Sequence, residues 1–265
     1  MYSVTSKLMP SNSYAEALKR KGKALFLPFV VLGDPDKNRS VEIIRKLVDS
    51  GADALELGLP FSDPPADGPV IQEADTRALK AGIHIDDCFE ILKEVRIFTN
   101  IPIGLLVYYN LILQRGIEKF YQDCAESGVD SVLVADLPLE HAEEVLPIAR
   151  KHGIAAVFLV SEVTTDERLK KIAEVTDGYL YVVSYLGVTG VTNAILEGKI
   201  RETIERARKY SKLPLIVGFG INSPEHAAAA VRAGADGVIV GSRIVKESGD
   251  LNAVMRLCRE LSRAM

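Results

Sequence analysis

Cysteine and histidine are scarce in this sequence, and their positions argue against the sites that these residues usually build. The 265-residue chain has three cysteines, which lie far apart: Cys88, Cys124 and Cys258. An odd number of widely spaced cysteines predicts neither a disulfide framework nor a zinc site, and it is typical of a reduced, cytoplasmic protein. The four histidines show no metal-ligand spacing: His84, His141, His152 and His226. We therefore expect no bound metal.

The chain also lacks an excess of basic residues and any long apolar run. Its formal net charge is −4, which provides no basic surface for nucleic acid. No apolar stretch reaches the ~20 residues needed to cross a bilayer, and the first residues lack the charged-then-apolar pattern of a signal peptide. With 48% hydrophobic and 26% charged residues, the composition is typical of a soluble globular protein that does not enter a membrane.

Short apolar runs alternate with amphipathic, charged stretches from one end of the chain to the other. The apolar runs predict strands near residues 25–31, 53–58, 102–108, 130–136, 154–160, 179–184, 214–218 and 236–240. The stretches between them predict helices near residues 38–50, 86–98, 114–127, 140–152, 165–176, 199–211, 224–233 and 250–263. A short additional helix is expected near residues 13–21. Eight strand–helix units predict an α/β fold, a parallel sheet closed into a (β/α)8 TIM barrel.

A repeated pattern supports the barrel. The segments DSGADALELGLP, ESGVDSVLVADLP and RAGADGVIVGSR each place a helix end, a glycine, a small residue and an aspartate before a strand. Their glycines, Gly51, Gly128 and Gly234, suit the left-handed position that ends a helix. The alternative, an open doubly wound sheet, lacks the Gly-x-Gly-x-x-Gly loop expected after its first strand. Because no linker or change in composition divides the chain, we expect one domain over residues 1–265.

The segment ELGLPFSDPPADGP, residues 56–69, places a glutamate in an apolar strand. Alternation along the strand predicts that Glu56 faces the barrel axis between two small residues, with Leu55 and Leu57 facing the helices. A buried carboxyl group has a raised pKa, in the range useful for proton transfer at neutral pH. A structural ion pair inside the barrel is the alternative explanation for Glu56.

The loop after this strand is acidic and rich in proline. Asp63 and Asp67 lie among four prolines: Pro60, Pro64, Pro65 and Pro69. Acidic loop residues commonly form turns and caps. However, the prolines lower the entropy cost of ordering the loop, and a preorganised carboxylate suits a site where charge develops. Asp136, at the end of the fourth strand, is more typical of a residue that orients its neighbours or caps the next segment.

Glycine-containing segments end the last three strands: LGVTG (186–190), GFG (218–220) and GS (241–242). Glycine lets backbone N–H groups approach an anion, and a short helix beginning near Ser242 would add its dipole. TIM barrels often bind phosphate in this region. No lysine ends a strand, so a Schiff-base aldolase is unsupported, and no histidine trio supplies a metal. We therefore expect acid–base catalysis by carboxyl groups on a phosphorylated substrate.

Four segments resemble the tryptophan synthase α subunit, in the same order and over essentially the whole chain. They are FLPFVVLGDP (26–35), DALELGLPFSDPPADGPVIQ (53–72), GVTG (187–190) and GFGI (218–221). The second is the specific one, since GVTG and GFG alone are weak signals. The resemblance implies a lyase of tryptophan biosynthesis that cleaves indole-3-glycerol phosphate to indole and glyceraldehyde 3-phosphate without a cofactor.

The resemblance also assigns roles to matching residues. Glu56 would be the general acid–base that protonates indole C3 and helps to remove the glycerol hydroxyl proton, and Asp67 would interact with the indole N–H. Tyr181 would lie near the substrate, and Thr189 would close over Asp67. The walls of the indole pocket would be Phe29, Ile71, Leu106, Leu133 and Phe219. The phosphate would be held by Gly190, Gly220, Gly241 and Ser242.

The family pairs this subunit with a pyridoxal-phosphate β subunit, to which indole passes, and the resemblance implies an α2β2 assembly. Pro60 and Asp63 match positions at that interface. The chain departs from the family's common residues at Pro65, at Val31 (often threonine) and at Val191 (often alanine), and we expect these changes to affect loop closure and activation by the partner more than the chemistry.

Three other functions remain open from the sequence. The first is another phosphate-binding barrel, an isomerase or an indole-ring-forming synthase, against which the missing strand-end lysine and the pairing of Glu56 with Asp67 argue. The second is a non-catalytic subunit that binds a phosphate ligand and regulates its β partner. The third is a free-standing lyase that releases indole.

Overall fold

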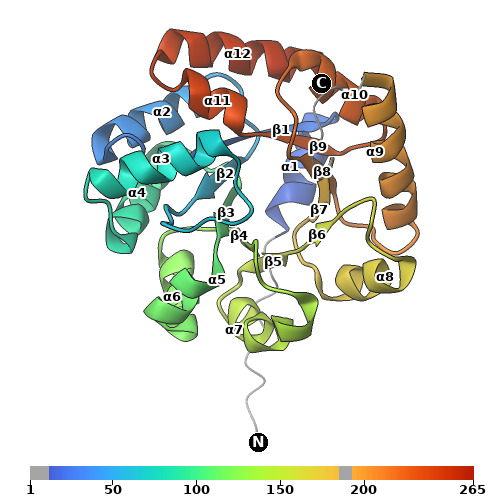
Figure 1. Ribbon diagram of the computed structural model, residues 1–265, viewed down its shortest axis with the longest axis horizontal. Helices are drawn as coiled ribbons and strands as arrows, with labels where there is room; N and C mark the ends of the chain where they lie inside the picture. Colours follow the sequence, from blue (N-terminus) through green and yellow to red (C-terminus); the bar gives the residue numbers. More distant parts are fainter. Residues whose placement is uncertain (1–11, 185–192) are drawn as a thin grey trace, which may run out of the picture.

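The computed structural model describes residues 12–184 and 193–265. These residues form a nine-stranded sheet in the order β5-β4-β3-β2-β1-β9-β8-β7-β6, and its pairings are parallel. The strands are β1 (Leu25–Val31), β2 (Leu55–Gly58), β3 (Ile103–Val107), β4 (Ser131–Val134), β5 (Ala155–Val157), β6 (Leu159–Val160), β7 (Leu180–Val183), β8 (Leu215–Gly218) and β9 (Gly237–Val240). Helices surround the curled sheet (Figure 1), so the predicted TIM barrel is confirmed.

The strand predicted near residues 154–160 consists of two strands, β5 and β6, separated by Phe158. β5 pairs with β4 and β6 pairs with β7, so the two strands lie at opposite edges of the sheet. Because these strands follow one another directly in the chain, the two edges come together and the barrel is nearly closed. The apolar run is continuous in sequence, which is why the break at Phe158 was not predicted.

The helices lie close to their predicted positions, with four differences. They are α1 (Ser13–Lys21), α2 (Lys37–Asp49), α3 (Pro69–Lys80), α4 (Ile85–Phe98), α5 (Tyr109–Arg115), α6 (Ile117–Glu126), α7 (Leu146–Lys151), α8 (Asp166–Val175), α9 (Asn193–Arg208), α10 (Pro224–Arg232), α11 (Ser242–Glu247) and α12 (Leu251–Ala264), with a 3-10 helix η1 (Leu139–Glu144) before α7. The helix predicted near 114–127 is α6, and the preceding helix α5, divided from it at Gly116 (φ +84°), was not predicted. Helix α9 begins at Asn193, earlier than the predicted start near residue 199. The helix predicted near 140–152 is η1 and α7. The helix α3, which follows the acidic loop and begins at Pro69, was not predicted.

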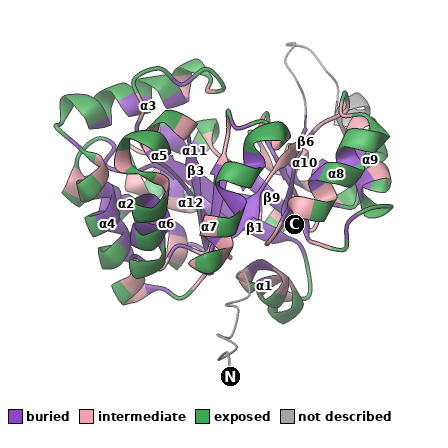
Figure 2. Cartoon of the chain, turned by 90° about the horizontal axis from the view of Figure 1, so that it is seen from below, coloured by how far each residue is buried: buried purple, intermediate pink, exposed green. Residues whose placement is uncertain are grey.

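Helix α1 lies beneath the barrel, at the end where the strands begin (Figure 2). Its Tyr14 is fully buried, and the Tyr14 ring meets the ring of Tyr179 edge-on at 4.7 Å between centroids. The Tyr14 hydroxyl lies 2.7 Å from the Ser131 hydroxyl at the start of β4. The helix therefore closes this end of the barrel, and the strands are buried on both faces, as is usual for parallel sheets.

The three aspartates of the repeated pattern share the same structural role. Each accepts a hydrogen bond from the backbone of the neighbouring strand: Asp53 from Phe26 N–H, Asp130 from Ile103 N–H and Asp236 from Leu215 N–H, at 2.8, 2.9 and 2.7 Å. Each also pairs with a basic side chain: Lys21, Arg96 and Arg208, respectively. The three glycines of the pattern have positive φ, as predicted. The repeat therefore fixes neighbouring strands relative to one another at the bottom of the barrel.

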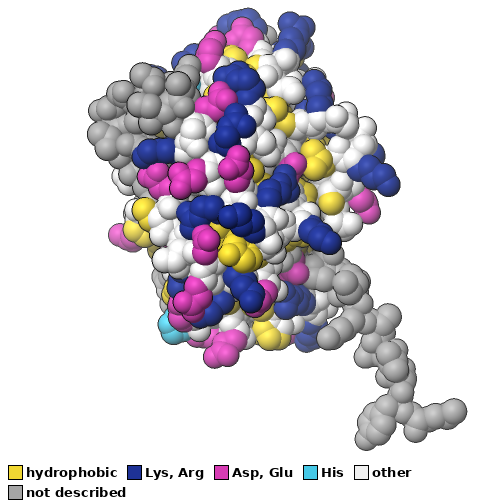
Figure 3. Space-filling view, turned by 90° about the vertical axis from the view of Figure 1, so that its right-hand side faces the viewer, with side chains coloured by type: hydrophobic (Ala, Val, Ile, Leu, Met, Phe, Trp, Pro, Cys, Tyr) yellow, Lys and Arg dark blue, Asp and Glu magenta, His cyan; other side chains and the backbone are white. Residues whose placement is uncertain are grey.

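Charges of both signs are mixed on the face of the molecule that carries α8, α9 and α10 (Figure 3), with hydrophobic side chains scattered among them. No helix in the described part of the chain has the length and apolar character needed to span a membrane. Among the same residues no cluster of histidine, cysteine, aspartate and glutamate could hold a metal ion.

Candidate active site

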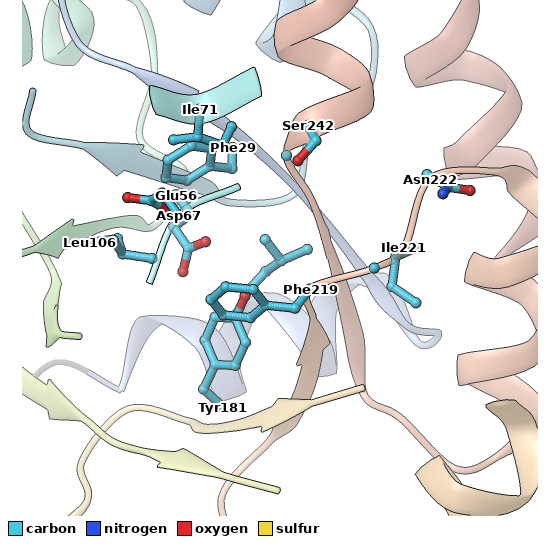
Figure 4. Close-up of a pocket in the computed structure, with 13 residues that line it drawn as sticks. Phe29, Glu56, Asp67, Ile71, Leu106, Tyr181, Phe219, Ile221, Asn222 and Ser242 are labelled. Carbon is cyan, nitrogen blue, oxygen red and sulfur yellow. The ribbon is translucent and has the colours of Figure 1, made fainter. Parts of the chain in front are cut away.

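A cavity of about 180 Å³ opens at the carboxyl ends of the strands (Figure 4). It is lined by ten of the residues for which a catalytic or binding role was predicted: Phe29, Glu56, Asp67, Ile71, Leu106, Tyr181, Phe219, Gly220, Gly241 and Ser242. They come from β1, β2, β3 and β7, from the loops after β2, β8 and β9, and from the starts of α3 and α11. Segments far apart in the sequence therefore converge on one cavity.

Glu56 lies in β2, paired in register with Phe29 of β1 and Gly104 of β3. Its side chain is 2% exposed and lines the cavity, as the alternation along the strand predicts. The Tyr179 hydroxyl donates a hydrogen bond to Glu56 Oε1 over 3.3 Å. No ion pair to Glu56 occurs within the described residues, so the structure offers no support for a structural ion pair at this position.

Burial raises the pKa of Glu56 from 4.5 to about 8. The hydrogen bond from Tyr179 opposes this shift, and the negative charge of Asp67 adds to it. Figure 4 shows the Glu56 and Asp67 side chains next to each other on one side of the cavity. A carboxyl group with a pKa near neutrality, open to a cavity, can both donate and accept a proton at neutral pH.

Asp67 lies in the loop between β2 and α3, and Tyr108 holds its carboxylate. The Tyr108 hydroxyl donates to Asp67 Oδ2 over 2.7 Å and accepts from the Ala66 backbone N–H over 3.2 Å. The Gln72 side chain donates to the Asp67 carbonyl over 2.7 Å. Partial burial raises the pKa of Asp67, and the hydrogen bond from Tyr108 opposes the rise. The carboxylate is therefore fixed in place, as the proline-rich loop suggested.

Apolar and aromatic side chains enclose the space beside the two carboxyl groups. Figure 4 shows Ile71 and Phe29 on one side of this space, with Tyr181 and Phe219 on the other. Phe219 has a φ of +60°, which is uncommon outside glycine and is typical of functional sites. The Ser184 hydroxyl donates to the Phe219 carbonyl and so holds this turn.

The opposite end of the cavity is polar. Figure 4 shows Ser242 and Asn222 on the side away from Glu56 and Asp67. Gly241 precedes α11, and Gly220, with a φ of +70°, follows Phe219. Two acids thus lie at one end of an apolar chamber, and glycine-rich turns lie at the other end. This arrangement suits an elongated ligand with an aromatic ring at one end and an anion at the other.

The sequence profile of the tryptophan synthase alpha chain family matches residues 15–261. The chain belongs to this family. It is 53% identical over 235 residues to the tryptophan synthase alpha chain of Methanothermobacter thermautotrophicus, covering 89% of this chain and 87% of that one. It is 50% identical over 226 residues to the alpha chain of Methanoregula boonei, covering 85% of each.

Solved structures agree with the family membership. The tryptophan synthase subunit alpha of Legionella pneumophila has a TM-score of 0.86 and 36% identity, covering 96% of this chain and 98% of that one. A chain of the tryptophan synthase a2b2 complex from Pyrococcus furiosus has a TM-score of 0.81 and 39% identity, covering 90% and 97%. The resemblance of the four sequence segments to this family is therefore confirmed.

Five further residues have a family-derived role, of which the structure describes Leu133, Pro60 and Asp63. Leu133 is buried on β4, where it pairs with Leu106, and it does not line the cavity. Thr189 and Gly190 lie outside the described residues. Pro60 is buried at the start of the acidic loop, whereas Asp63 is exposed.

Several residues of the site were not predicted. Ile221, Asn222 and Ile239 also line the cavity, and Tyr108 and Tyr179 hydrogen-bond to its two acids. Ile221 and Asn222 directly follow the glycine turn, so their position in sequence could have indicated them. Asp136 accepts a hydrogen bond from the Tyr109 backbone N–H over 2.7 Å and so caps the start of α5, the structural role expected for it.

Proposed function

We propose that this chain cleaves indole-3-glycerol phosphate to indole and glyceraldehyde 3-phosphate, as the alpha chain of a tryptophan synthase. The observation that carries the proposal is Glu56, a desolvated carboxyl group without a cationic partner among the described residues, which faces the cavity beside Asp67. Membership of the alpha chain family supports the choice of reaction.

In the proposed reaction Glu56 transfers two protons. Its carboxyl group, largely protonated at neutral pH because of the raised pKa, gives a proton to indole C3. The bond between C3 and the adjacent glycerol carbon then breaks, and its electron pair restores the aromatic indole. The hydroxyl group on that glycerol carbon loses its proton to the Glu56 carboxylate as the aldehyde forms, which returns Glu56 to its starting state.

Asp67 stabilises the intermediate of this reaction. Protonation of C3 places positive charge on the indole ring, and the Asp67 carboxylate accepts a hydrogen bond from the indole N–H as that charge develops. Because Tyr108 already fixes the carboxylate, little reorganisation is needed at the moment of reaction. The apolar side chains around the acids exclude water from the ring, and we assign the phosphate to Gly220, Gly241 and Ser242 at the polar end.

Some assignments extend beyond the described residues or beyond this chain. We assign Gly190 to the phosphate and Thr189 to closure over Asp67. We further propose that the chain pairs with a tryptophan synthase beta chain through the surface around Pro60 and Asp63 and that pyridoxal phosphate belongs to that partner. Burial of three free cysteines supports a reducing, cytoplasmic location.

The test is indole formation from indole-3-glycerol phosphate, measured with the purified chain alone and after addition of a beta chain. Glu56→Gln keeps the size of the side chain but cannot transfer a proton, so we expect a loss on the order of 10²-fold or more in kcat. Glu90→Gln, which removes an exposed carboxylate from α4, is the matched control and keeps the wild-type rate.

The same experiment separates the other candidate functions. An unchanged rate for Glu56→Gln would contradict the assignment of Glu56 as the acid–base. Substrate binding without turnover in the wild type, with and without a beta chain, would indicate a non-catalytic binding subunit. Full turnover by the chain alone, with no gain on adding the beta chain, would indicate a free-standing lyase.

A further inference from the structure

A buried carboxyl group on α3 hydrogen-bonds to the acidic loop that carries Asp67. Asp75 is 3% exposed. Its Oδ1 accepts a hydrogen bond of 3.4 Å from the Phe61 backbone N–H. Its Oδ2 is buried without a hydrogen-bond partner among the described residues. Burying a carboxyl group in this way is costly. An apolar side chain would avoid this cost but could not accept the hydrogen bond from Phe61.

Phe61, which hydrogen-bonds to Asp75, is in contact with Tyr108, which hydrogen-bonds to Asp67. The Phe61 ring stacks on the Tyr108 ring, with centroids 5.1 Å apart and planes inclined by 23°. Tyr108 in turn donates its hydroxyl hydrogen bond to the Asp67 carboxylate at 2.7 Å. A continuous series of contacts therefore runs from α3 through the loop to the cavity.

We propose that Asp75 is a positioning residue, whose buried carboxyl group fixes Phe61 and, through the stack of Phe61 on Tyr108, sets the place of Asp67 in the cavity. The consequence for turnover rests on the proposed function, because it requires Asp67 to act on a substrate. The fixing of Phe61 by its hydrogen bond to Asp75, called the hold on Phe61 below, does not depend on that function.

The charged groups around Asp75 make this hold dependent on pH. Asp67 faces it from the loop, Asp34 from the turn after β1 and Tyr108 from the start of α5. Arg77, on the same helix, is engaged by Asp34 through two hydrogen bonds of 2.7 and 2.8 Å. The structure therefore places two acids, and no uncommitted base, against Asp75 in the described part of the chain.

Burial, and then the charges of Asp67 and Asp34, raise the pKa of Asp75 to about 7, against the opposing effect of the Phe61 N–H bond. The carboxyl group is therefore mostly neutral at pH 6 and mostly ionised at pH 8. A hydrogen bond to an ionised acceptor is stronger than one to a neutral acceptor. The hold on Phe61 tightens as the pH rises through this range.

Hydrogen exchange of the Phe61 amide, followed by NMR in the full chain without ligand, tests the hold directly. After correction for intrinsic exchange, we expect protection in the wild type to rise about five-fold between pH 6 and pH 8, the factor for about 1 kcal/mol. Asp75→Asn keeps the shape and an acceptor but cannot ionise, so its protection stays constant. Glu73→Gln, an exposed carboxylate on the same helix, is the matched control and behaves as wild type.

Steady-state kinetics test the consequence for Asp67. Asp75→Leu removes the acceptor for Phe61, and we expect kcat to fall about ten-fold or more while KM changes less than about two-fold, since the phosphate end of the cavity is untouched. Asp75→Asn recovers most of kcat but no longer shows the ionisation near pH 7 in its rate profile. If Asp75→Leu does not fold, the pH profile of Asp75→Asn provides the same test.

The outcomes separate this proposal from the proposed function. Protection of Phe61 that is independent of pH in the wild type, or equally pH-dependent in Asp75→Asn, would overturn the hold. An unchanged kcat and rate profile in the variants of an active enzyme would overturn the positioning role. A wild-type chain that protects Phe61 as expected but does not cleave indole-3-glycerol phosphate would contradict the proposed function and leave the hold supported.

Discussion

Two tyrosine hydroxyl groups hold the two acids of the cavity, and both tyrosines lie outside the motif that predicts those acids. Tyr179 donates to Glu56 from the start of β7, and Tyr108 donates to Asp67 from the end of β3. In each case the hydrogen bond favours the ionised carboxyl group, whereas burial favours the neutral one. The pKa of each acid is therefore set by two opposing effects, burial and the hydrogen bond from the tyrosine.

At this scale we predict the effect of Tyr108→Phe, which removes the hydroxyl group and keeps the ring. Loss of a hydrogen bond to the charged form raises the pKa of Asp67 further, so the acid limb of the kcat/KM profile moves to higher pH. We also expect kcat to fall on the order of ten-fold, because Asp67 is less firmly placed. The measurement is the pH dependence of indole formation by the isolated chain.

Tyr109→Phe provides the control for this experiment. Its hydroxyl donates to Glu144 over 2.7 Å on the outside of the barrel, away from the cavity. We expect its pH profile to match the wild type. A Tyr108→Phe profile that coincides with that of Tyr109→Phe would show that Tyr108 has no influence on Asp67.

At the scale of secondary-structure elements, close packing between β7 and β8 positions Tyr181, which lines the cavity. The two strands pair from Leu180 with Leu215 to Val183 with Gly218. A Cβ atom at Gly218 would lie 1.9 Å from the Tyr181 hydroxyl oxygen, which is far inside van der Waals contact. The glycine at the end of β8 is thus required for Tyr181 to lie across the strand.

We therefore predict that Gly218→Ala displaces Tyr181 into the substrate space. The expected result is a fall in kcat/KM on the order of 10²-fold, dominated by a rise in KM, with the barrel still folded. Gly198→Ala on α9 is the matched control, because a Cβ atom there meets no other atom within 4 Å. Steady-state kinetics and far-UV circular dichroism check both variants, and an unchanged KM for Gly218→Ala would refute the packing argument.

At the scale of the whole molecule, the buried acids reduce stability at high pH. The pKa of Glu56 in the folded chain is about 8, against an ordinary value of 4.5. Between these pH values the folded state holds a proton that the unfolded state has lost, so the free energy of unfolding falls as the pH rises. Asp75, with a pKa of about 7 against 3.8, acts in the same direction.

We predict that Glu56→Gln is more stable than the wild type at pH 9 and nearly equal to it at pH 4.5. The difference between the folded and ordinary pKa values corresponds to on the order of 5 kcal/mol at high pH. Urea denaturation at the two pH values measures it, with Glu90→Gln as the control. A variant that shows the same loss of stability with pH as the wild type would contradict burial of a neutral Glu56.

The amino-acid sequence by itself determined the barrel and the identity of its two central acids. Periodicity located the strands to within about two residues, because parallel strands buried on both faces are continuous apolar runs between amphipathic helices. Glu56 was evident because a carboxyl group in such a run conflicts with burial. The prolines drew attention to the loop of Asp63 and Asp67, and the family resemblance singled out Asp67.

Only the tertiary structure decided what surrounds those acids. Tyr108, Tyr179 and Asp75 act through contacts with residues 41, 123 and 14 positions away in the chain, and no local pattern encodes such separations. Tyrosine at a strand end and aspartate on a helix are ordinary residues in sequence. They acquire their roles only when the closed barrel brings distant segments together and removes the water that would otherwise solvate the carboxyl groups.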